Sequence, residues 1–138
     1  MDLSAVMAAI NYWAVLAAAV TSFVIGGLWY SPLLFYRPWL RAAALSEEQL
    51  RHGNMALIFG LSLLLQLLAA FVLAMFLGVE ADAVFGASAG FMVGAAWVAT
   101  AFGVVYLFER RPVALFFING GYNVVAYTVM GAILGGWH

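Results

Sequence analysis

The sequence predicts an all-α, polytopic membrane protein: a four-helix transmembrane bundle with a short interfacial or cytoplasmic helical segment between its first and second helices. Hydrophobic residues make up 67% of the 138 residues and charged residues 8%, whereas soluble domains are about half apolar and about a quarter charged. A soluble fold of this composition would lack the polar side chains to cover its surface. The apolar residues also form four long runs, and no period-two alternation indicates a β-barrel.

Each apolar run is long enough to cross a bilayer as a helix, which takes about 20 residues. Helices are expected because lipid offers no partner to backbone N–H and C=O groups. The chain before the first run carries an acid and no Lys or Arg, unlike a secretory signal, so we expect the first run itself to be a retained helix. We therefore predict a single transmembrane domain over residues 1–138, with spans at roughly 10–30, 55–77, 84–108 and 113–136.

The arginines predict the orientation of these spans. All five lie in two connections: three follow the first span and the pair Arg110 and Arg111 follows the third. The connection between the second and third spans carries only acids, Glu80 and Asp82. Cytoplasmic loops are enriched in Lys and Arg. This pattern predicts that both arginine-bearing loops are cytoplasmic and that the N- and C-termini lie outside.

The stretch IGGLWYSPLLFYRPWLR marks a membrane boundary at the end of the first span. Trp29 and Tyr30 are typical of an aromatic belt, and the following proline cannot continue the helix. Trp39 then lies near Arg37 and Arg41 on a short segment, which is typical of an interfacial amphipathic helix. We interpret these five residues as interfacial anchors. The functional alternative is a patch that docks an anionic lipid or a partner.

Later in the same connection, the stretch LSEEQL has the residue order of a helix start. A serine is followed three residues later by a glutamine, which is the order of a capping box. Two glutamates lie in the first turn, where they suit the helix dipole. A short cytoplasmic helix is expected here.

Several function classes lack the residues they need. The chain has no cysteine, which excludes disulfides, thiolate metal sites and cysteine nucleophiles. No Asp, Glu, Lys, Arg or His lies well inside a predicted span, whereas proton-coupled transporters need a buried group of this kind. Small multidrug exporters use an acid in the first helix, where this chain has Thr21 and Ser22. His52 and His138 lie on opposite predicted sides, so they cannot share a metal site. We expect no enzyme, no catalytic residues, no metal and no cofactor.

Four uncharged polar residues are predicted to form a midplane layer. Ser22, Gln66 and Asn123 each lie about 10 or 11 residues into a span, or roughly 15–17 Å deep at the rise of an α-helix. Asn119 lies one turn before Asn123 on the same face. The simpler interpretation is interhelical hydrogen bonding. The alternative is a path for a small neutral or weakly polar solute, which would require oligomers.

The third span carries a strip of small residues. Gly86, Gly90 and Gly94 repeat every four residues, which lets a neighbouring backbone approach closely. Trp97, about one turn further on, is expected on the same face. This strip is either a packing face within the monomer or the face of a homodimer or partner complex.

The segments NYWAVLAAAVTSFVIGGLWYSPLLFYRPW and INGGYNVVAYTVMGAILGGW carry a family resemblance, together with the glycine-rich third span. They resemble small bacterial membrane proteins grouped as domain of unknown function seventeen sixty-one. The resemblance covers most of the chain. It implies a four-helix, multi-pass protein of the bacterial inner (plasma) membrane with no assigned activity, and it supplies no catalytic residues.

Two functions remain open at this point. The first is a non-enzymatic interaction protein, either an accessory subunit or a homo-oligomer, supported by the charge-free interior and the small-residue faces. The second is a transporter or channel component that uses the midplane layer. The expected partners are the lipid bilayer and either a second copy or a larger membrane complex. The net charge of −1 gives no field that would recruit nucleic acid.

Overall fold

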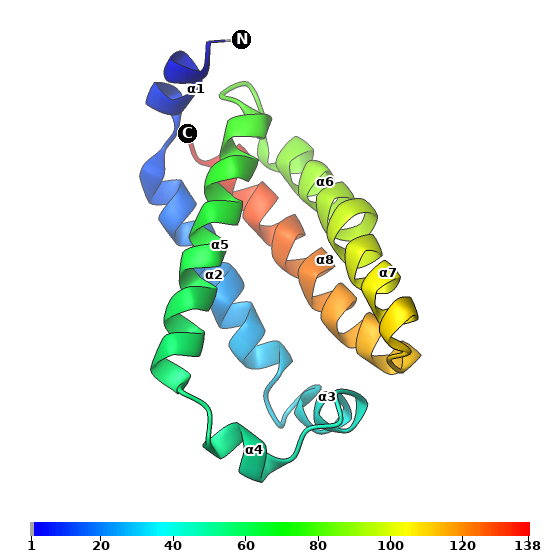
Figure 1. Cartoon of the computed structure of the whole chain (residues 1–138). Helices are drawn as coiled ribbons and strands as arrows, with labels where there is room; N and C mark the ends of the chain where they lie inside the picture. Colours follow the sequence, from blue (N-terminus) through cyan, green and yellow to red (C-terminus); the bar gives the residue numbers. More distant parts are fainter. Residues whose placement is uncertain (1) are drawn as a thin grey trace.

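The computed structural model describes residues 2–138, which contain helices and turns and no strand (Figure 1). Four helical stretches have the length and hydropathy of membrane spans. The predicted fold class is therefore confirmed. In chain order the helices are α1 (Leu3–Ala9), α2 (Tyr12–Trp29), α3 (Tyr36–Ala42), α4 (Glu47–Arg51), α5 (Met55–Leu77), α6 (Ala83–Val93), the π-helix η1 (Gly94–Ala99), α7 (Thr100–Glu109) and α8 (Val113–Gly136).

Helix α8 is the central element of the bundle. It contacts α2 and α5 on one side and the continuous stretch α6–η1–α7 on the other, while α5 and α6 barely touch (Figure 1). The buried core lies where α2, α5 and α8 meet, and small alanines of α2 let the other two helices come close. Met130 of α8 is fully buried in this core.

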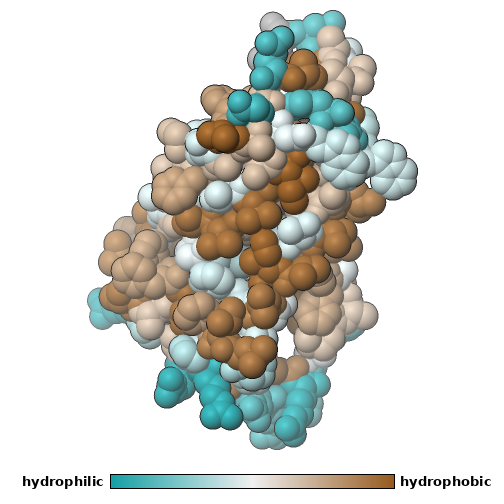
Figure 2. Space-filling view, turned by 180° about the vertical axis from the view of Figure 1, so that it is seen from behind, coloured by the Kyte–Doolittle hydropathy of each residue, from teal (hydrophilic) through white to brown (hydrophobic). Residues whose placement is uncertain are grey.

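The outer faces of the long helices are apolar. Helix α5 has a mean hydropathy of 2.5 over its most apolar window, of which only 11% is buried. Figure 2 shows a broad hydrophobic band between hydrophilic residues at the two ends of the molecule. Side chains of this kind are stable in hydrocarbon and not in water, so the molecule is a multi-pass membrane protein.

Side-chain caps set where several helices begin. The Asn11 side chain accepts hydrogen bonds from the backbone N–H groups of Trp13 and Ala14, which starts α2 after a break that separates it from α1. Ser46 and Gln49 form the capping box expected at the start of α4. The sequence pattern gave no signal for α1, because its seven residues are too few to carry a clear period.

The third span contains a π-helical segment that the sequence pattern did not indicate. It corrects the prediction for Trp97. Hydrogen bonds from i to i+5 put more residues into each turn, so a residue three positions after Gly94 no longer lies above it. Gly94 is buried, whereas Trp97 is 71% exposed. The expectation that Trp97 shares the face of the glycines is therefore wrong.

Candidate functional site: two hydrogen-bonded clusters inside the bundle

Ser22, Gln66 and Tyr122 join α2, α5 and α8, and we call them the serine cluster. Ser22 Oγ donates to Gln66 Oε1 at 2.9 Å. Gln66 Nε2 donates to Tyr122 Oη at 3.0 Å, and Tyr122 Oη donates to the Ser22 carbonyl at 2.9 Å. Ser22 is fully buried. The three side chains thus satisfy one another without a charged group.

Asn119 is the centre of a second group with Tyr30 and Tyr106, the asparagine cluster. The Tyr30 hydroxyl donates to Asn119 Oδ1 at 2.7 Å. Asn119 Nδ2 donates to Tyr106 Oη at the same distance of 2.7 Å. One amide of α8 therefore binds both the end of α2 and the middle of α7, which lie on opposite sides of it.

The two clusters touch through their aromatic rings. The Tyr30 and Tyr122 rings meet edge to face, with centroids 5.6 Å apart. Gly26 makes room for this arrangement, since a Cβ there would lie 3.2 Å from Tyr122 Oη. The polar interior is therefore one continuous group of residues that crosses the bundle around α8.

The four residues expected to form one layer are divided by the structure. Ser22 and Gln66 are hydrogen-bonded to each other, whereas Asn119 belongs to the other cluster. Asn123 Nδ2 donates to the Asn119 carbonyl of its own helix at 2.8 Å and joins no other helix. An asparagine can satisfy its amide within its own helix in this way, so depth alone does not place it in a network.

The three tyrosines of the clusters were absent from the predicted layer. A tyrosine in a membrane span has a polar tip that needs a partner, and Tyr122 lies well inside α8. That position was the available signal for Tyr122. Tyr30 was interpreted as an interfacial anchor because it follows Trp29 at the end of a span.

Trp29 and Tyr30 differ from the anchors that the sequence predicts. Trp29 Nε1 donates to the Ile118 carbonyl of α8 at 2.9 Å, and Tyr30 donates to Asn119. Their polar atoms thus bind a helix, whereas an interfacial anchor turns them toward headgroups. The third aromatic residue, Trp39, is half-buried against the Tyr30 ring, with centroids 5.8 Å apart.

Arg37 and Arg41 are exposed on α3, which packs against α8. Helix α3 lies at the same end of the molecule as the turn between α7 and α8 (Figure 1). Contact of these two residues with headgroups stays a prediction.

Gly86, Gly90 and Gly94 pack against α8 of the same chain. A Cβ on Gly86 or Gly90 would overlap the backbone carbonyl of Gly131 or Tyr127, and one on Gly94 would lie 2.8 Å from the Asn123 carbonyl oxygen. The glycines therefore face the interior of the monomer. They are not accessible to a second copy.

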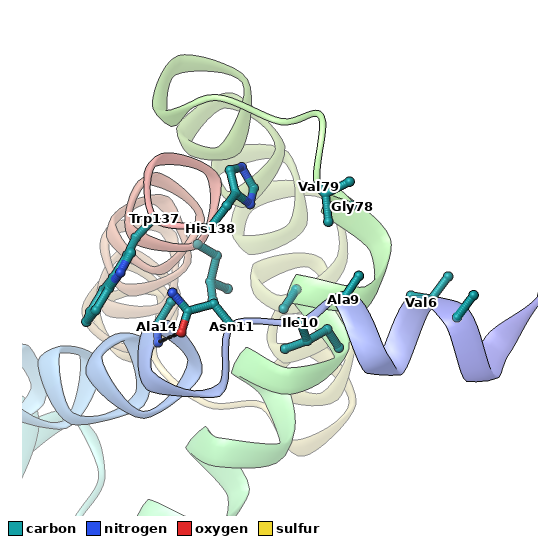
Figure 3. A pocket seen from close by; sticks show the side chains of 12 residues that line it. Val6, Ala9, Ile10, Asn11, Ala14, Gly78, Val79, Trp137 and His138 are labelled. Carbon is teal, nitrogen blue, oxygen red and sulfur yellow. Dashed lines mark hydrogen bonds between the residues drawn. The ribbon is translucent and has the colours of Figure 1, made fainter.

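Two open cavities lie outside the serine cluster, and the second of them is lined in part by Tyr106 of the asparagine cluster. One, of about 300 Å³, is formed by α1 and the adjoining ends of α2, α5 and α8 (Figure 3). Two of its polar side chains are already engaged: Asn11 caps α2, and the His138 ring contacts the Ala81 carbonyl. The other, of about 240 Å³, lies at the turn between α7 and α8. Neither is lined by Gln66 or Asn123.

The structure offers no constellation that suggests chemistry. Within residues 2–138, no group of three or more His, Asp or Glu side chains could hold a metal ion. The hydrogen-bonded interior contains amides and hydroxyls but no acid or base. Nothing in the described residues indicates catalysis.

Apolar outer faces and internally satisfied polar groups together define a polytopic helical membrane protein. The chain belongs to the family described as protein of unknown function (DUF1761), whose sequence model matches residues 13–135. This match confirms the resemblance carried by the first and last spans. No curated protein and no solved structure matches the chain.

Proposed function

We propose that this protein is a non-enzymatic membrane subunit that binds another transmembrane helix through the exposed face around Trp97. The helix belongs either to a second copy of the chain or to another subunit of a larger complex. The single observation that carries the proposal is the unsatisfied indole N–H of Trp97 in the middle of the third span.

Trp97 lies far from both ends of the helical stretch Ala83–Glu109. Its side chain is 71% exposed, and within residues 2–138 its Nε1 has no hydrogen-bond partner. Tryptophan is usually found at the two membrane interfaces, where its N–H reaches water or headgroups. An N–H in hydrocarbon without an acceptor is unfavourable. A partner that supplies a carbonyl or hydroxyl oxygen would remove that cost.

The surroundings of Trp97 suit a helix as the partner. Ala96, Thr100 and Ala101 are exposed beside it. Thr100 Oγ1 donates to the Ala96 carbonyl, so its hydroxyl is already satisfied within its own helix. Small residues next to a large ring let a second backbone approach while the ring packs over it.

The interior of the bundle supports the same class of function. Within residues 2–138, no buried side-chain nitrogen or oxygen lacks a hydrogen-bond partner. Ser22, Gln66 and Tyr122 use one another, and interhelical bonds of this kind contribute on the order of 0.6 kcal/mol each in membranes. Ser22, Gln66 and Asn119, which could have lined a solute path, thus hold helices together, while Asn123 bonds within its own helix. No observation favours transport, and we do not propose it.

Photo-crosslinking in native membranes tests the proposal. A photoreactive residue at Ala101 keeps Trp97 in place, and a matched control at Leu64 probes the exposed face of α5, where the side chain is 60% exposed. We expect a discrete protein adduct from position 101 and none from position 64. The mass of the adduct identifies a second copy or another subunit.

The variants Trp97→Phe and Trp97→Ala in the same background separate the roles of the N–H and the ring. We expect Trp97→Phe to weaken the adduct and Trp97→Ala to abolish it. Equal adducts at positions 101 and 64, or an adduct that does not change in either variant, would overturn the proposed function.

A further inference from the structure

The cavity at the turn between α7 and α8 combines an apolar wall with hydrogen-bond donors. It is open, has a volume of about 240 Å³, and is lined by Gly103 and Tyr106 of α7, Arg111 of the turn, and Phe116 of α8. It lies where two spans end, which is the depth of the headgroups in a bilayer. It is distinct from the Trp97 face.

Two of the lining residues, Arg111 and Tyr106, carry hydrogen-bond donors. Arg111 has an exposed side chain and makes one ion pair, Nε to Glu109 Oε2 at 3.8 Å. A long pair between exposed groups contributes little, so a phosphate can compete with it. Tyr106 Oη accepts from Asn119, but within residues 2–138 nothing accepts the proton of its own hydroxyl. The Arg111 guanidinium group and the free O–H of Tyr106 are both donors that form strong hydrogen bonds to an anionic oxygen.

The apolar wall exists because residue 103 is a glycine. A Cβ at Gly103 would lie 3.1 Å from Cε2 of Phe116, so even one added carbon narrows the cavity. Leu107 and Val113, at its rim, are 80% and 70% exposed. These exposed aliphatic groups connect the cavity lining to the apolar outer surface of the molecule.

The turn carries a second arginine, Arg110, in a backbone conformation that is unfavourable for a residue other than glycine. Arg110 ends α7 in the left-handed region with φ 57°, which is unfavourable for a residue other than glycine because of the clash of its Cβ with the backbone. Glycine would end the helix there without strain. Arginine at this position adds a second positive charge to the turn, and the sequence Glu109-Arg110-Arg111 has a net charge of +1.

We propose that this cavity binds one anionic phospholipid. The phosphate lies between the Arg111 guanidinium and the Tyr106 hydroxyl, and the upper part of one acyl chain packs over Phe116 and the open space beside Gly103. Arg110 contributes to the preference for a net negative headgroup. The proposal does not depend on the Trp97 interface.

The test uses the full-length protein in detergent, with phosphatidylglycerol, phosphatidylcholine or inorganic phosphate added and lipid binding followed by native mass spectrometry and thermal shift. We expect one phosphatidylglycerol to bind at least about fivefold more tightly than phosphatidylcholine, as one or more arginines at a membrane surface would give. Inorganic phosphate alone is expected to give no thermal shift at the same concentration, because it leaves the apolar wall empty.

Three variants locate the site. Arg111→Gln is expected to remove most of the preference for phosphatidylglycerol, and Gly103→Leu to prevent binding of either lipid by filling the cavity. Arg51→Gln is the matched control, because Arg51 lies on α4 at the same end of the molecule and does not line the cavity.

Some results would overturn the proposal. These are equal binding of the two lipids, an equal thermal shift with inorganic phosphate, or an equal loss in Arg51→Gln and Arg111→Gln. If Gly103→Leu does not fold, the comparison of the two arginine variants still decides the outcome.

Discussion

Gly86 of α6 and Gly131 of α8 lie against each other, and a Cβ added to either one would overlap the carbonyl group of the other. The contact between these two helices is therefore made by backbone atoms. A side chain can change its rotamer to relieve a close contact, whereas two packed helical backbones cannot. The α6–α8 contact therefore has little room to accept an added side-chain atom.

Gly90→Ala tests this close contact. The new methyl group would overlap the Tyr127 carbonyl, and we expect overpacking to reduce the free energy of unfolding by about 1–3 kcal/mol. The measurement is unfolding in mixed micelles, followed by circular dichroism.

Gly60→Ala is the matched control, because a Cβ at Gly60 meets nothing within 4 Å. Alanine is the better helix former by about 1 kcal/mol, so this variant is expected to be neutral or stabilising. Equal effects of the two substitutions would contradict the packing described for α6 and α8.

Tyr122→Phe tests the serine cluster. The variant keeps the ring against Tyr30 but removes the hydroxyl that accepts from Gln66 Nε2 and donates to the Ser22 carbonyl. We expect a loss of about 0.6–1.7 kcal/mol in the free energy of unfolding, which is the range found for hydrogen bonds between membrane helices.

A double-mutant cycle that combines Tyr122→Phe with Gln66→Leu shows whether the loss of free energy of unfolding comes from the interaction between these two residues. If the hydroxyl acts through Gln66, the two effects are not additive. Tyr36→Phe on α3 is the control, since the Tyr36 hydroxyl makes no hydrogen bond within residues 2–138. Fully additive effects would mean that the serine cluster does not couple α5 to α8.

The spans were predictable because one property, transfer into lipid, acts on every residue of a long run. The depth of each residue along its span, calculated from the rise per residue, predicted that Ser22 and Gln66 lie at the same level. In the structure these two side chains are hydrogen-bonded to each other. Asn119 and Asn123 lie on one face at similar depths, but only Asn119 bonds to other helices. Depth and helical face do not say which neighbour a side chain reaches, and that choice separates the two asparagines.

The π-helical segment and the role of Tyr30 could not be predicted for a different reason. A π-turn depends on packing of the whole helix against its neighbour, and Gly94–Ala99 has no residue pattern that encodes it. Tyr30 follows a tryptophan at the end of a span. A tyrosine in that position can either anchor the helix at the membrane interface or donate a hydrogen bond to another helix, and the sequence is the same in both cases. Tertiary contact with Asn119 decides between them.

Asn119→Leu and Asn123→Leu form a matched pair that tests this separation. Asn119 bonds to Tyr30 and Tyr106 on other helices, whereas Asn123 bonds only to its own helix. Since two interhelical bonds are lost in the first variant and none in the second, we expect Asn119→Leu to cost about 1 kcal/mol or more and Asn123→Leu much less. A larger effect at Asn123 would restore the single polar layer suggested by the sequence.

Reconstituted liposomes test the transport alternative directly. Purified protein is expected to give no flux of urea, glycerol or another small neutral solute above that of empty vesicles, because Ser22, Gln66 and Tyr122 are engaged with one another. Stopped-flow light scattering measures this flux. If the native protein gives flux, and this flux falls in Gln66→Leu and Asn123→Leu but not in Gly60→Ala, the protein is a transporter or channel component and the proposal of an interaction protein is wrong.

The absence of cysteine makes the predicted orientation testable without altering the native chain first. Gly53→Cys introduces one thiol at the arginine-bearing end, after α4, and Val79→Cys introduces one at the opposite end, after α5. The positive-inside rule places the arginines in the cytoplasm, so a membrane-impermeant maleimide is expected to label position 79 in intact cells and position 53 only after permeabilisation. The opposite labelling pattern would reverse the orientation, and equal labelling of both positions in intact cells would show that the arginines do not fix a single topology.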